Sequence, residues 1–165
     1  MQRQPTLLSS CARAATAAEA RYRITAPPFT RRGSRVIALD ERAAAVVEQM
    51  QLAGQRWSGG HFLVFDSAVP DDALLRRAAG GTALLSEELD GADTVVMVAT
   101  AQASAEAASI IGDACAARSI MSAGLVVPEA GPVGEVVSAL RPNAMVLVVL
   151  QDAADVPEVL SALRV

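Results

Sequence analysis

The stretch DGADTVVMVATAQASAEAASIIGDACAARSIMSAGLVV, residues 90–127, contains a complete strand–helix–strand unit. Its run at residues 94–99 is almost wholly apolar, which is typical of a strand buried on both faces of a parallel sheet. The alanine-rich residues 103–118 have the length of a helix, and residues 121–127 form a second apolar run. Such a unit predicts two parallel strands joined by a helix that covers the sheet.

The same alternation continues on both sides of this unit. We expect further strands at residues 35–39, 61–65, 82–85 and 144–150, and helices at residues 41–53, 70–79, 86–89, 132–140 and 155–163. Helices between apolar strands must pack on both faces of the sheet, because the crossovers are right-handed. We therefore predict an α/β fold of three layers, with a doubly wound, mostly parallel, Rossmann-like sheet.

Charge divides the chain into two parts. Residues 1–33 carry six arginines against one acid, and residues 34–165 carry eight arginines against 17 acids. Pro27 and Pro28 exclude a helix at the junction. We predict a basic N-terminal arm at 1–33 and one folded domain at 34–165. The arm has no repeated basic and aromatic pattern, so docking on an acidic protein surface is favoured over nucleic-acid binding, and an organellar transit peptide is the alternative.

Composition excludes several classes of function. The chain contains no lysine, so a Walker-type lysine or a Schiff-base lysine is impossible. The heavy use of Ala, Arg, Gly and Val is typical of a GC-rich bacterial genome. No apolar run approaches the length of a membrane span, and Cys11 and Cys115 lie far apart, without metal-ligand or disulfide spacing. We expect a cytoplasmic protein with no metal and no cofactor.

The order and spacing of three segments resemble the nucleotide-binding domain of the tubulin and FtsZ family. The segments are RVIALDERAAAVVEQMQLAG at 35–54, HFLVFDSA at 61–68, and EELDGADTVVMVAT at 87–100, followed by a helix and IMSAGLVVPE at 120–129. In that family a glycine-rich loop follows the first strand, and a second loop, Gly-Gly-Gly-Thr-Gly-Thr-Gly, cradles phosphates after the fourth. The resemblance implies a nucleotide-binding scaffold.

Both phosphate loops depart from the family pattern. Here they are DERAAA at 40–45 and TAQASAE at 100–106, and neither contains a glycine. Phosphate binding at such loops needs closely approaching backbone N–H groups and no competing negative charge. Asp40, Glu41 and Glu106 place carboxylates at about the phosphate positions. We therefore expect a degenerate member of the family that does not bind GTP in the family manner.

Polar side chains follow the predicted strands at the edge where doubly wound sheets bind ligands. The candidate ligand-binding residues are Asp40, Asp66, Ser67, Thr100, Gln102 and Ser104. Each also has a structural explanation, because Asp40 and Ser104 suit helix N-caps and the others suit loops. An acid after the second strand, such as Asp66, holds ribose hydroxyls in dinucleotide folds, but the accompanying GxGxxG is absent.

Catalytic groups are sparse. His61 is the only histidine, and Cys115 lies inside an alanine-rich helix, where we expect a buried and inert thiol. Three hypotheses remain. The first is a non-catalytic FtsZ-like domain that acts through self-association or a protein partner. The second is a small-molecule or nucleotide-binding module that uses Asp40, Asp66 and Gln102. The third is an enzyme, which would require Asp40, Asp66, Ser67 and His61 to converge.

Overall fold

The computed structural model describes residues 33–53, 60–128, 131–163 and 165. The chain divides into two units, residues 1–30 and 31–165, and everything described below belongs to the second. Apart from Gly33, the predicted N-terminal arm lies outside the described residues. Among the described residues, no helix combines the length and the apolar character needed to cross a bilayer.

A seven-stranded sheet forms the centre of the domain, in the order β4-β3-β2-β1-β5-β6-β7. Strands β1, β2, β5, β6 and β7 run parallel, and β3 runs antiparallel to both β2 and β4. The strands are β1 Gly33–Ala38, β2 Gly60–Val69, β3 Asp72–Arg77, β4 Thr82–Leu84, β5 Ala92–Ala99, β6 Met121–Val126 and β7 Val146–Val149. The predicted three-layer, mostly parallel α/β fold is confirmed.

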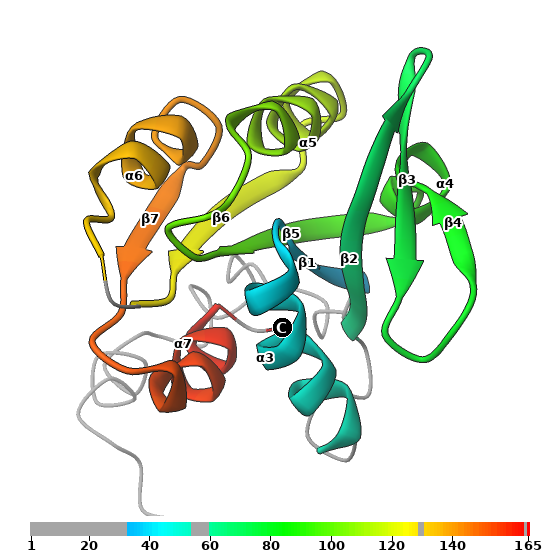
Figure 1. Cartoon of the computed structure of the whole chain (residues 1–165). Helices are drawn as coiled ribbons and strands as arrows, with labels where there is room; N and C mark the ends of the chain where they lie inside the picture. Colours follow the sequence, from blue (N-terminus) through cyan, green and yellow to red (C-terminus); the bar gives the residue numbers. More distant parts are fainter. Residues whose placement is uncertain (1–32, 54–59, 129–130, 164) are drawn as a thin grey trace, which may run out of the picture. The chain divides into compact units, whose positions relative to one another are not determined.

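Helices cover both faces of this sheet, as Figure 1 shows. One face carries α3 and α7, and the other carries α4, α5 and α6. The helices are α3 Glu41–Leu52, α4 Leu85–Leu89, α5 Ala105–Ala117, α6 Gly134–Leu140 and α7 Val156–Ala162, with a 3₁₀ turn, η2, at Ala153–Asp155. Each predicted helix apart from the one at 70–79 is present, with bounds shifted by one or two residues.

Two apolar cores hold the layers together. Val47 of α3 and Leu160 of α7 pack with Val96 of β5 on one face. Ile111 of α5 and Leu140 of α6 pack with the strands on the other face. Full burial of a Val, Leu or Ile side chain contributes roughly 1.5–3 kcal/mol to the stability of the fold. The central strands, whose carboxyl ends would bind a ligand, are therefore packed on both faces.

The helix predicted at residues 70–79 is wrong, because Asp72–Arg77 forms strand β3. Pro70 and Asp71 instead make a tight turn from β2, with Val69 opposite Asp72. Asp71 has a φ of 61°, and proline followed by a positive φ is the pattern of a type II turn. A proline followed by two acids, as at residues 70–72, is compatible with both a helix start and a turn. This pattern therefore does not distinguish the two structures. Within β3 only Ala73 and Leu75 are buried, as alternation in a strand requires.

Candidate functional site

The strand order reverses at β1. From β1 the chain passes through α3 to β2 on one side, whereas β5 lies on the other side and is followed by α5 on the opposite face. In doubly wound folds the ligand crevice opens at this point, beyond the carboxyl ends of the two central strands. Here these ends lead directly to Asp40 and Thr100.

Asp40 caps helix α3. Its backbone is extended, and its Oδ1 accepts hydrogen bonds from the backbone N–H groups of Arg42 (3.0 Å) and Ala43 (2.9 Å). These are two of the donors that a helix N-terminus leaves unsatisfied. The predicted N-cap role of Asp40 is therefore confirmed.

The same carboxylate also closes the crevice against β5. Asp40 Oδ2 accepts from the backbone N–H of Thr100 at 2.8 Å, and Oδ1 accepts from the Thr100 hydroxyl at 3.0 Å. Thr100 is 1% exposed. An acidic group of the chain itself thus occupies the helix N-terminus, which is the position that a phosphate takes in nucleotide-binding relatives of this fold. A phosphate there would have to displace Asp40 and meet its charge.

The remaining residues of the β5–α5 loop have structural partners. The backbone N–H of Gln102 donates to the Thr100 hydroxyl at 3.3 Å. Ser104 caps α5, because its Oγ accepts from the backbone N–H of Glu106 at 3.1 Å. Of the six predicted ligand-binding residues, Asp40, Thr100 and Gln102 are brought together. Asp40 and Thr100 satisfy each other's polar groups, whereas Gln102 joins them through its backbone N–H and its side chain is exposed.

Asp66 and Ser67 do not join this network. Strand β2 pairs with β1 only as far as Val64 and then continues to Val69 in the hairpin with β3. Asp66 lies at the register shift between Phe65 and Ser67, so it marks a bulge in the hairpin and not the end of the strand. Both side chains are exposed, and the Ser67 hydroxyl donates to Asp66 at 3.3 Å. Among the described residues, the only hydrogen bond to the Asp66 carboxylate is the one from its neighbour Ser67.

His61 lies at the opposite end of the strands. It pairs with Arg35 at the start of β1, five residues before Asp40. At about 3.3 Å per residue this separation is roughly 16 Å, and the same number of residues separates His61 from Asp66 along β2. Acid and base partners must come within hydrogen-bond reach of one substrate. The arrangement that the enzyme hypothesis requires is therefore not present.

A buried ionic cluster at this opposite end was missed by the sequence interpretation. Glu88 of α4, 4% exposed, is its centre. Its Oε2 lies 2.8 Å from Nδ1 of His61 and 3.2 Å from Nε of Arg35, and its Oε1 lies 2.8 Å from a guanidinium nitrogen of Arg77. Arg35 Nε also donates to the backbone carbonyl of Glu88 at 2.6 Å. Arg35, inside the apolar run of β1, is the feature of the sequence that could have indicated this cluster, because a buried charge requires a partner.

The cluster determines the ionisation of Glu88. Burial raises the pKa of this carboxyl, but the hydrogen bonds from His61 and Arg77 and the charges of both residues outweigh it, so that the pKa is lowered. Glu88 therefore remains ionised and joins β1, β2 and β3 to α4. The cluster is a structural clamp, because its central carboxylate is engaged on both oxygens.

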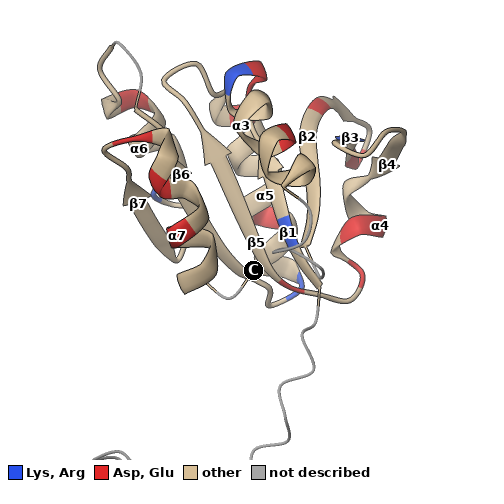
Figure 2. Cartoon of the chain, turned by 90° about the horizontal axis from the view of Figure 1, so that it is seen from below, with Lys and Arg blue, Asp and Glu red and all other residues tan. Residues whose placement is uncertain are grey.

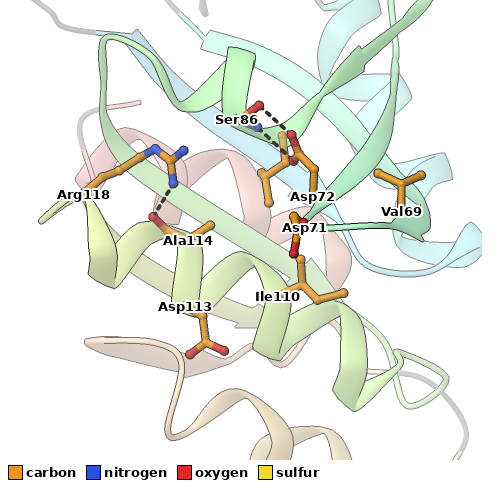
Figure 3. Close-up of a pocket in the computed structure, with 9 residues that line it drawn as sticks. Val69, Asp71, Asp72, Ser86, Ile110, Asp113, Ala114 and Arg118 are labelled. Carbon is orange, nitrogen blue, oxygen red and sulfur yellow. Dashed lines mark hydrogen bonds between the residues drawn. The ribbon is translucent and has the colours of Figure 1, made fainter.

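The cleft shown in Figure 3 lies between the β2–β3 hairpin, α4 and α5 and has a volume of about 360 Å³. Val69, Leu85 and Ile110 provide apolar contact, and charged groups surround them. These charged groups are Asp71, Asp72, Asp113 and Arg118. The volume is at the lower end of the range for small-ligand pockets.

Asp72 is the best-held carboxylate of this cleft. Its Oδ2 accepts from the Ser86 hydroxyl at 2.6 Å, and its Oδ1 accepts from the backbone N–H groups of Ala73 (2.8 Å) and Ser86 (3.2 Å). Burial raises the pKa of Asp72, but these hydrogen bonds and the charge of Arg118 together lower it. Sequence reasoning missed this cleft because it placed residues 70–79 in a helix.

Cys115 is buried within α5, as predicted. Burial raises the pKa of its thiol to about 11, and the nearby charge of Arg118 opposes this shift only in part. The thiol is protonated at neutral pH and is a poor nucleophile. Within the described part of the chain, His, Cys, Asp and Glu side chains form no group of three that could hold a metal ion.

No protein-family model matches the sequence, and no curated protein matches it significantly.

Proposed function

We propose that this chain is a non-catalytic, FtsZ-like α/β domain that acts by associating with a second copy of itself or with a protein partner. The observation that carries the proposal is the uncharged edge strand β7, on which Val146 is 39% and Val149 is 48% exposed. Exposed apolar surface at a sheet edge favours pairing with another chain. The heavy use of Ala, Arg, Gly and Val supports a bacterial setting for this association, and the absence of disulfide spacing between Cys11 and Cys115 supports a cytoplasmic one.

The closed crevice supports the non-catalytic part of the proposal. Asp40 and Thr100 satisfy each other where a nucleotide would bind, and His61 lies at the far end of the strands. Binding of GTP would require breaking these hydrogen bonds and placing phosphate beside a carboxylate, which costs free energy on both counts. We therefore infer that the scaffold is kept while phosphate chemistry is lost.

Two measurements on the full chain test this proposal. Static light scattering is expected to show a stable oligomer, and thermal melting with GTP and Mg²⁺ is expected to show no change in Tm. A monomer at all concentrations would contradict association. A rise in Tm with GTP that is absent for ATP would contradict the loss of nucleotide binding, because a ligand of the native state stabilises it.

The cleft of Figure 3 favours a second candidate, a small-molecule-binding module. Its carboxylates and its apolar lining residues suit a compact ligand that carries an amine or several hydroxyls. The test is thermal melting with small amines and polyols, repeated with Asp71→Asn as the variant. A rise in Tm that Asp71→Asn abolishes would support the module, and the absence of any rise would exclude ligands of this class.

A further inference from the structure

Strand β7 forms one edge of the sheet. Exposed apolar residues lie on this strand and immediately before it. Met145, just before the strand, is 78% exposed, and the side chains of Val146 and Val149 are also open to solvent. Figure 2 shows β7 in tan along its length, while α3, α4, α6 and α7 all carry acidic residues. The segment 144–150, AMVLVVL, contains no charge, no proline and no glycine.

The outer side of β7 also offers backbone groups for pairing. The N–H of Met145 donates to Ser122 of β6 at 2.9 Å. Met145 precedes the strand; within it, Val149 is in register with Val126, and the next N–H, of Leu150, donates to Val126 at 2.9 Å. Backbone groups alternate in direction along a parallel strand, so those of Leu147 and Val149 point away from β6. Among the described residues, no strand lies on that side. Natural edges are protected by charges, prolines or bulges, and β7 has none of these.

The edge is held in place before any partner binds. The Ser122 hydroxyl donates to the carbonyl of Asn143 at 2.9 Å, and the Asn143 side chain donates to the carbonyl of Ala139 at 2.9 Å. Leu147 packs against one core and Val148 against the other. A strand fixed from both faces loses little conformational entropy on pairing.

We propose that two copies of this chain pair their β7 strands antiparallel about a two-fold axis that passes through Leu147 and runs perpendicular to the sheet. This inference rests on the proposed association function and assigns its surface. The pairing joins two seven-stranded sheets into one continuous sheet, with α5 and α6 of both copies on the same side.

The alternation of side chains selects this register. Residues opposite each other in an antiparallel pair share a face, so Val146 faces Val148, and Met145 faces Val149 of the second copy. Met145 and Val149, the two most exposed apolar residues of segment 144–150, thereby cover each other. A register shifted to centre on Val148 would instead place the apolar Met145 opposite the polar Gln151.

Charge at the two ends of β7 favours a second copy and an antiparallel direction. Arg141 precedes the strand, and Asp152 and Asp155 follow it. Antiparallel pairing brings the basic end of one copy to the acidic end of the other, whereas parallel pairing would bring like charges together. The basic N-terminal arm is a poorer occupant, because its arginines would lie against an uncharged edge.

Matched double variants at the same two positions test the register. Met145→Arg with Val149→Arg places like charges opposite each other across the axis, and Met145→Arg with Val149→Glu places opposite charges there. Within one chain these residues are about 13 Å apart, so the charges act mainly between copies. Sedimentation of the full chain should show the dimer Kd weakened by roughly tenfold or more for the first variant and largely restored for the second. Leu52→Arg, at an 87% exposed position on α3, is the control and should leave the Kd unchanged.

Hydrogen exchange gives an independent measurement that needs no substitution. The amides of Leu147 and Val149 should become protected as protein concentration rises, while those of the β4 edge should not. A wild-type monomer would overturn both this inference and the proposed function. A dimer that is equally stable in both double variants, with β7 amides unprotected, would overturn only the β7 interface and leave association intact. A dimer weakened equally by both double variants would overturn the register.

Discussion

The Asp40 carboxylate and Thr100 are joined by two hydrogen bonds, of 2.8 and 3.0 Å, across the carboxyl ends of β1 and β5. The Asp40 carboxylate therefore both caps helix α3 and accepts hydrogen bonds from the buried Thr100. This pair occupies the position at which doubly wound folds bind their ligands, and it links the two central strands.

Replacing Asp40 by alanine should cost more stability than an ordinary cap substitution. The change removes the α3 cap and leaves the buried Thr100 groups without their acceptor, so we expect the free energy of unfolding to fall by about 2–4 kcal/mol. Ser104→Ala, which removes only the α5 cap, should cost about 1 kcal/mol. Urea denaturation of both variants measures the difference. Equal losses would show that the Asp40–Thr100 contact contributes nothing beyond capping.

Loss of the Glu88 carboxylate should leave Arg35 buried without its main partner. We expect Glu88→Leu to lower the free energy of unfolding by about 3–5 kcal/mol. The exposed neighbour Glu87 provides the control, since Glu87→Gln should change stability by no more than about 0.5 kcal/mol. Adding Arg35→Met to Glu88→Leu should recover part of the loss, because an apolar pair carries no desolvation cost. A double variant less stable than Glu88→Leu would contradict this account.

The same cluster predicts a dependence of stability on acid. Because the folded-state pKa of Glu88 is lowered, its contribution is fully present above its unfolded pKa, about 4.3, and is lost as pH falls through the folded value. The pKa of Asp72 is lowered as well, so the contribution of Asp72 to stability is also lost as the pH falls. Tm measured from neutral pH to about pH 3 should therefore fall, and less steeply in Glu88→Gln than in wild type. Parallel pH profiles for the two proteins would show that Glu88 does not contribute.

Cys115 should resist alkylation while the protein is folded. Burial and a pKa of about 11 leave almost no accessible thiolate at neutral pH. Site-resolved mass spectrometry after brief iodoacetamide treatment should find Cys115 unmodified in buffer and modified in denaturant. Rapid modification under native conditions would indicate an open or reactive site in α5.

The sequence predicted most of the fold because its strands are continuous apolar runs. Val95 to Val98 are all buried in β5, as expected for a central parallel strand. The segment at 70–79 failed because local helix signals competed with the need of β2 for a partner on its outer side. Such a need depends on the whole sheet and is not encoded in a short window.

The candidate site was predictable in part for the same reason. Strand order places Asp40 and Thr100 together once a doubly wound sheet is assumed, and both were expected at the crevice. Their mutual hydrogen bonds were not predictable, because capping and ligand binding use the same side chains. The contact of Glu88 with Arg35 joins residues 53 positions apart, and only tertiary packing brings them together.

Sedimentation velocity of the full wild-type chain over a concentration series, with and without GTP and Mg²⁺, tests the central claim most directly. We predict a shift from monomer to dimer as concentration rises, identical with and without nucleotide. A chain that remains monomeric without GTP and assembles only when GTP is added would contradict the account.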